Sequence, residues 1–259
     1  MSNTQFITLK KWQWIILAIL TYLLFLIAYT PATLVAHHIN KQSGNQVQLS
    51  GVSGTLFEGY ANTLSMQGLR VNQVKWELSP LSLLGLSPSI DMQGGNIRDT
   101  NGIYVKGTVS TSLLDSTAIE ANQVQLFVPT KTVLAQLTLP VFVTASGRFR
   151  VDINTFQFDQ GCAQLQGKGS WLNAAVNVNN NPISFGTFEA NLSCQTPNFI
   201  VEVSPSNKLS LDAQLNIDMS GKYKVEGRFK VPSDLPKEIQ QAAQFFGNPS
   251  NDGYYNITL

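Results

Sequence analysis

Residues 209–231 read LSLDAQLNIDMSGKYKVEGRFKV, and this stretch decides the fold. Apolar or small side chains stand at every second position over residues 209–219 and again over residues 223–231, with polar and charged residues between them. Because successive side chains of a strand point to opposite faces, both halves are predicted to be half-buried β-strands. Ser220-Gly221 separates the halves and is a turn signal, so the stretch predicts an antiparallel hairpin.

The same period of two runs through most of the chain after residue 45. It is clearest over residues 141–153, and weaker alternations occupy residues 74–78, 103–109, 124–128, 188–192 and 199–203. A dozen or so such strands joined by turns predict a mainly β protein with one large antiparallel β-domain, apolar on one face and polar on the other. The pattern leaves three forms of closure open, namely a sandwich, a partly open barrel and a curved groove.

Three segments depart from this alternation. Residues 80–86 are too apolar for an exposed loop and too short to predict a helix. Residues 233–247 predict a short C-terminal helix that packs on the sheet, with Ser233 or Asp234 as its N-cap and Gly247 as its stop. Residues 254–259 predict a last strand that returns to the core.

The N-terminal part has the composition of a membrane anchor. Residues 12–36 contain no charged side chain, and about 20 apolar residues in a helix cross a hydrocarbon core of about 30 Å. We therefore predict a single transmembrane helix over residues 12–36. Because Lys10 and Lys11 precede it, the positive-inside rule places residues 1–11 in the cytoplasm and residues 37–259 on the other side.

A cleaved signal peptide is the alternative reading of this segment. Signal peptides usually have an apolar region of about 7–15 residues that ends at a small-x-small site. Here the apolar run is longer, and Leu34-Val35-Ala36 places leucine where a small residue belongs. An uncleaved anchor is the better interpretation.

The chain has two cysteines, Cys162 and Cys194. A protein exported to an oxidising compartment can join such a pair in a disulfide, which would stabilise the domain by roughly 3 kcal/mol. Two buried free thiols are the alternative. Neither cysteine lies in a C-x-x-C pair, so the spacing does not indicate a redox or zinc site.

The chain offers little material for catalysis. Charged residues make up 13% of it and the formal net charge is +1, so it lacks the surplus of cations that nucleic-acid binding requires. Both histidines, His37 and His38, precede the strands, so a Ser-His or Cys-His mechanism has no base in the β-domain. The alternative is an exported hydrolase that uses a carboxylate pair such as Asp91 and Asp99, but no other catalytic motif accompanies this pair. We expect a protein that is no enzyme and has no catalytic, cofactor-binding or metal-ligating residues.

Basic residues also gather on the polar faces of the predicted strands. Since acids stand between them, we interpret them as solvated charges and not as a binding stripe. They are Arg148, Arg150, Lys222, Lys224, Arg228 and Lys230.

Two short motifs in the first third of the chain are familiar. The first is a G-T-L-aromatic-x-G string, and a V-x-W-x-L-x-P string follows it after about 15 residues. Their members are Gly54, Thr55, Leu56, Phe57 and Gly59, then Val74, Trp76, Leu78 and Pro80. With the N-terminal anchor, the cysteine pair and the short last strand, they make the chain resemble the type II secretion system protein N family, with Phe57 where that family usually has tryptophan.

The resemblance implies a function in protein export. It implies a non-catalytic accessory component of the inner-membrane platform, a single-pass protein whose bulk lies in the periplasm and whose partners are other inner-membrane components of the secretion machinery. Similar strings occur in AsmA-like periplasmic proteins, which implies a second reading as a lipid-handling or envelope-maintenance protein with lipid on the apolar face. No cofactor follows from either reading.

Overall fold

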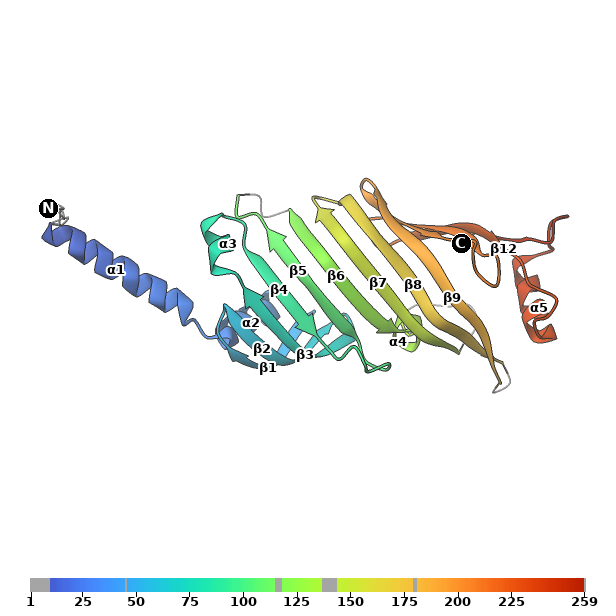
Figure 1. Ribbon diagram of the computed structural model, residues 1–259, viewed down its shortest axis with the longest axis horizontal. Helices are drawn as coiled ribbons and strands as arrows, with labels where there is room; N and C mark the ends of the chain where they lie inside the picture. The colour runs from blue at the N-terminus through green and yellow to red at the C-terminus, as the bar shows by residue number, and fades with distance from the viewer. Residues whose placement is uncertain (1–9, 45, 115–117, 137–143, 179–180, 259) are drawn as a thin grey trace, which may run out of the picture.

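The computed structural model describes residues 10–44, 46–114, 118–136, 144–178 and 181–258. Thirteen strands form one antiparallel sheet in which each strand pairs with its neighbours in the chain, from β1 at one edge to β13 at the other (Figure 1). The strands are β1 Val47–Gly54, β2 Glu58–Met66, β3 Leu69–Leu78, β4 Ser89–Gly94, β5 Tyr104–Thr111, β6 Ile119–Pro129, β7 Ala145–Phe158, β8 Cys162–Val178, β9 Asn181–Gln195, β10 Asn198–Val203, β11 Asp212–Ile217, β12 Tyr223–Phe229 and β13 Tyr255–Thr258.

The large antiparallel β-domain predicted from the sequence is confirmed. Of the three closures left open, the described residues adopt the curved open sheet, because the strand order is linear and its two end strands do not pair with each other. Each strand lies beside its predecessor, whether a turn or a longer segment such as the one with α5 (Lys237–Ala243) between β12 and β13 connects them, which gives a meander without crossovers.

Apart from α1 (Lys11–Ala28), which has 18 residues, the helices are short. The others are α2 Ala32–Gln42, α3 Pro80–Leu84, α4 Thr130–Leu134 and α5 Lys237–Ala243, with a 3₁₀ turn, η1, at Gln244–Phe246. The undecided segment 80–86 thus contains α3, which begins at Pro80.

The segment expected to be one helix over residues 12–36 is divided in two. α1 ends at Ala28 and α2 begins at Ala32, with Pro31 in an extended conformation between them. Proline lacks the N–H that a helix interior needs, and it disfavours helix at the residue before it. Figure 1 shows α1 projecting away from the β1 end of the sheet. Among the helices of the described residues, none combines the length and apolar character of a membrane span.

The apolar face of the sheet is only partly covered. Its best-packed region is a cluster at the ends of β8 and β9, formed by Ala174, Phe185 and Phe188 with Leu235 from the segment before α5. Ile239 of α5 packs against this cluster, so the expected contact between the C-terminal helix and the sheet is confirmed.

That helix is shorter than the sequence predicts. It begins at Lys237, with Pro236 as N-cap, and neither Ser233 nor Asp234 caps it. The N–H of Leu235 donates instead to the carbonyl of Pro232 at 3.2 Å, so the preceding residues form a turn. The predicted last strand is present as β13.

The hairpin of residues 209–231 is confirmed, with a late start. The Asn207 side chain accepts hydrogen bonds from the N–H groups of Leu209 (3.1 Å) and Leu211 (2.9 Å), so these residues do not join the ladder and β11 begins at Asp212. In the turn, Ser220 donates through its hydroxyl and its N–H to the Asp218 carboxylate, which lowers the pKa of that carboxyl.

β7 overlaps the segment 141–153, the one predicted most clearly as a strand, and continues beyond it to Phe158; residues 141–143 lie outside the described part of the chain. Gly147 has a φ of 111°, and the register of β7 against β8 shifts between Ser146 and Arg148. This bulge interrupts the simple alternation that the sequence predicts.

Candidate functional site

The first motif forms the tight turn between β1 and β2. The Thr55 N–H donates to the Glu58 carbonyl at 2.8 Å, and the Thr55 Oγ1 accepts the Glu58 N–H at 3.2 Å. Gly54 has a φ of 89°, and a Cβ added there would lie 2.5 Å from the Glu58 carbonyl oxygen. Glycine is therefore required at this position by both conformation and space.

The second motif packs on the first. Gly59 of β2 and Trp76 of β3 are cross-strand partners, and a Cβ at Gly59 would lie 2.2 Å from the indole ring. The indole N–H donates to the Leu56 carbonyl at 3.3 Å, and the Leu78 N–H donates to the Phe57 carbonyl at 2.6 Å.

The remaining motif residues lie close by. Val74 and Leu78 are buried on β3, and Pro80 begins α3. The structure thus brings the two motifs together. We predict that their role is structural, namely to pack the β1–β2 turn against β3.

The turn of the first motif also contacts the break between the N-terminal helices. The Leu56 N–H donates to the Thr30 carbonyl at 3.0 Å, and Pro31 forms an isolated antiparallel bridge with Thr55. Ala32 and Ala36 of α2 are buried. The first motif therefore joins the N-terminal helices to the first strands of the sheet.

α2 continues this attachment along the outer edge of β1. Asn40 accepts the Leu49 N–H at 2.9 Å and donates to the Leu49 carbonyl at 3.2 Å. Val47 lies two residues before Leu49 on the strand. The Ser43 hydroxyl accepts a hydrogen bond from the N–H of Val47 and donates one to its carbonyl. Two side chains thus occupy backbone positions that a neighbouring strand would use, which covers an otherwise exposed sheet edge. Sequence reasoning missed both residues.

Removing this cover gives a direct prediction. We expect Asn40→Ala to lower the free energy of unfolding by about 1–3 kcal/mol, because it leaves two backbone groups of Leu49 without their partner. The variant should also self-associate through β1. Equilibrium unfolding and light scattering of purified protein measure both effects, and Asn72→Ala, at an exposed site inside the sheet, is the control.

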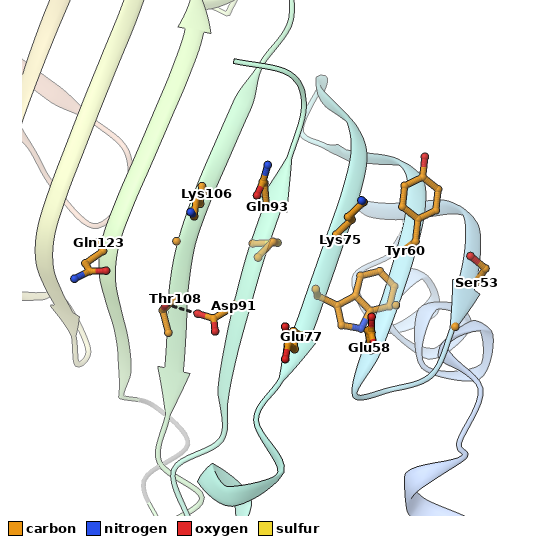
Figure 2. A pocket seen from close by; sticks show the side chains of 15 residues that line it. Ser53, Glu58, Tyr60, Lys75, Glu77, Asp91, Gln93, Lys106, Thr108 and Gln123 are labelled. Carbon is orange, nitrogen blue, oxygen red and sulfur yellow. Dashed lines mark hydrogen bonds between the residues drawn. The ribbon is translucent and has the colours of Figure 1, made fainter. Parts of the chain in front are cut away.

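A polar hollow of about 630 Å³ lies beside these motifs on β1 to β6 (Figure 2). Its charged side chains are Glu58, Lys75, Glu77, Asp91 and Lys106, and Thr108 donates a hydrogen bond to Asp91. The three acids lie in one cross-strand row, Glu58, Glu77 and Asp91, and the two lysines lie in a neighbouring row with Gln93 between them. Among the described residues, no group of histidines, cysteines and carboxylates could hold a metal.

This geometry does not favour hydrolysis by the carboxylate pair considered from the sequence. Asp91 lies on β4 and bonds Thr108, whereas Asp99 lies in the following loop and accepts the Asn101 N–H at 3.0 Å. Each carboxylate is held by local bonds. The polar hollow thus offers a charged surface in which Asp91 and Asp99 belong to separate elements and have separate partners.

Six basic residues are interpreted from the sequence as solvated charges, and for Arg148 this interpretation is wrong. Arg148 lies over the Phe127 ring at 4.5 Å and donates to the Ile97 carbonyl at 2.8 Å, so it fastens the loop between β4 and β5 to the sheet. Burial lowers the pKa of its guanidinium, and the Asp99 carboxylate partly offsets this. Lys224 does pair with an interleaved acid, Glu226, at 2.5 Å.

The predicted disulfide between Cys162 and Cys194 is confirmed. It joins the start of β8 to the end of β9, and Cys162 is fully buried. The bond closes a loop over 32 positions of sequence and connects two successive hairpins of the sheet.

A second hollow, of about 410 Å³, lies on the apolar face over β7 to β10. The rings of Phe149, Trp171 and Phe188 stack in a row, with centroids 5.5 Å and 5.6 Å apart. Val201 and Leu211 also line this apolar hollow, and its surface is almost wholly apolar. Such a lining suits a hydrocarbon ligand or an apolar side chain of a partner.

Comparison with known proteins decides the family. The model of a family described as type II secretion system (T2SS), protein N, matches residues 45–258, which contain all the strands, both motifs and both cysteines. The chain belongs to this family. The resemblance noted from the sequence is therefore confirmed.

Relatives named type II secretion system protein N match most of the chain. The one from Aeromonas hydrophila is 29% identical over 93% of this chain and 94% of its own. Those from Vibrio cholerae and Klebsiella pneumoniae are each 24% identical, over 81% and 83% of this chain and 82% and 81% of their own. No solved structure matches the chain.

Proposed function

We propose that the protein is a non-catalytic accessory component of the inner-membrane platform of the type II secretion system. It promotes export of folded periplasmic proteins across the outer membrane through contacts with other inner-membrane components. The observation that carries the proposal is the family match over residues 45–258.

We further propose that α1, the first part of the segment 12–36 predicted as an anchor, holds the protein in the inner membrane, with residues 1–11 in the cytoplasm and α2 and the sheet in the periplasm. Large apolar side chains along α1 are exposed, among them Ile15 (60%), Leu20 (58%) and Phe25 (56%), which suits a lipid environment. The disulfide suits an oxidising compartment. Carbonate extraction of membranes tests the anchor: the protein should stay in the pellet, and release into the supernatant would contradict it.

The secretion role is tested in a strain that lacks the gene. A secreted enzyme should accumulate in the periplasm by at least tenfold, and the complementing gene should restore its release. Unchanged secretion in the deletion strain would exclude the proposed role.

Lipid handling is the second candidate, and the apolar hollow favours it. Native mass spectrometry of the purified full chain should then detect bound phospholipid. Val201→Asp, which places a carboxylate in the hollow, should reduce the bound fraction at least fivefold, whereas Glu202→Ala on the opposite face should leave it unchanged. Lipid-free wild-type protein would remove this candidate and leave the secretion role intact.

A further inference from the structure

Within the described residues, the rest of the chain covers one edge of the sheet, at β1, and leaves the other edge, at β13, uncovered. The outer edge of β1 is covered by Asn40 and Ser43 of the α2 region, and Pro31 bridges to the residue that follows β1. At the other edge, β13 pairs with β12 over four residues, and no other backbone in the described part of the chain is hydrogen-bonded to its outer side. An uncovered edge presents a row of unpaired N–H and carbonyl groups that can pair with another strand.

Apolar side chains on one face accompany this open edge. Tyr255 stacks on Phe229 with ring centroids 5.4 Å apart, and Phe246 meets Phe229 edge-on at 5.2 Å. Beside them, Phe245 is 83% exposed. An incoming strand would therefore find backbone partners on β13 and an apolar surface for every second side chain.

The other face of the edge is polar. Asn256 and Thr258 of β13 are exposed, and they pair with Arg228 and Glu226 of β12. The charges near them are largely matched, since Arg228 lies 3.7 Å from Asp212 and Lys224 lies 2.5 Å from Glu226. The surface therefore suits a segment of alternating apolar and polar residues, and this segment can carry either positive or negative charges.

We propose that β13 accepts an extended segment of a partner protein, which adds a fourteenth strand to the sheet. The partner segment carries large apolar side chains at alternate positions, on the face of Tyr255 and Ile257. This inference rests on the proposed function, because it names the contact by which a non-catalytic secretion component acts.

A second copy of this chain fits the edge less well. Head-to-tail pairing of β13 with β1 is blocked by α2, and pairing of β13 with itself joins strands of four residues, about 13 Å long. Stable complexes bury about 800 Å² on each partner, which so short a contact does not supply alone. A longer segment of a different partner can pair with β13 and also pack on the exposed Phe245 beside it, which adds area that a second four-residue β13 does not supply.

Site-specific photo-crosslinking in secreting cells tests the contact. A photoreactive residue at Asn256 or Thr258 of the full chain should give an adduct with a component of the secretion machinery, and the same residue at Ser50 of β1 should give none. Because strand pairing fixes the register, the two β13 positions should mark partner residues two apart in one segment. Adducts only with another copy of this chain, scattered adducts, or no adducts would overturn the proposal.

A variant connects the edge to function. Ile257→Lys places a charge on the strand that should repel an added strand, and we expect secretion to fall at least tenfold with the protein level and the disulfide unchanged. Ser50→Lys on the covered edge is the matched control. If gene deletion blocks secretion but Ile257→Lys does not, this inference fails and the proposed function stands. If deletion itself has no effect, the proposed function fails.

Discussion

Replacing Cys162 and Cys194 together with alanine should lower the free energy of unfolding by about 3–4 kcal/mol. The disulfide closes a loop over 32 positions, and the entropy that this removes from the unfolded chain corresponds to that value. The effect should be large for a single-layer sheet, because few of its apolar side chains are fully buried and other stabilising contacts are sparse.

Urea unfolding of the full chain in mild detergent measures this effect. Reductant should shift the wild-type midpoint to that of the double variant and leave the variant unchanged. Equal stability of the oxidised wild type and the variant would show that the disulfide does not hold the hairpins together.

Gly59→Ala should be almost as damaging, with a loss of about 2–4 kcal/mol. Its added Cβ would lie 2.2 Å and 2.5 Å from two atoms of the Trp76 ring. The ring cannot move aside without losing its hydrogen bond to the Leu56 carbonyl. Overpacking costs about 1–3 kcal/mol and a lost hydrogen bond about 1 kcal/mol.

The sheet itself provides a matched control for this substitution. Gly169 also lies within a strand, and a Cβ there would meet its nearest neighbours at ordinary distances of 3.7 Å and 3.9 Å. Gly169→Ala should therefore change stability by less than about 0.5 kcal/mol. Adding Trp76→Leu to Gly59→Ala should recover part of the loss, and equal effects of the two glycine substitutions would contradict the packing of the two motifs.

Local patterns were enough to predict most of the strands. Alternation sets strand faces and Ser220-Gly221 sets a turn, so both could be predicted from neighbours in the sequence. The break at Pro31 is also local, but the prediction of one helix over residues 12–36 missed it. The cysteine pair could be predicted because the chain has no other thiols.

Features that depend on distant partners could not be predicted in this way. Asn40 acts on Leu49, and Arg148 acts on Phe127 and Ile97, through contacts that appear only when the sheet has formed. The late start of β11 follows from the side chain of Asn207, which competes with the ladder for backbone N–H groups. The way in which the sheet closes could not be predicted for the same reason. Alternation shows which face of the sheet is apolar but not which segment covers that face.

The central claim is that the β-domain, held at the inner membrane, is the working part of the protein. An anchor exchange tests it most directly: residues 1–28, which leave α2 and its contacts with β1 intact, are replaced by an unrelated single-span anchor with the same orientation, and release of a secreted enzyme is measured in the deletion strain. The account predicts release at the wild-type level. Release as low as in the deletion strain, with the exchanged protein present at normal amounts in the membrane, would contradict it.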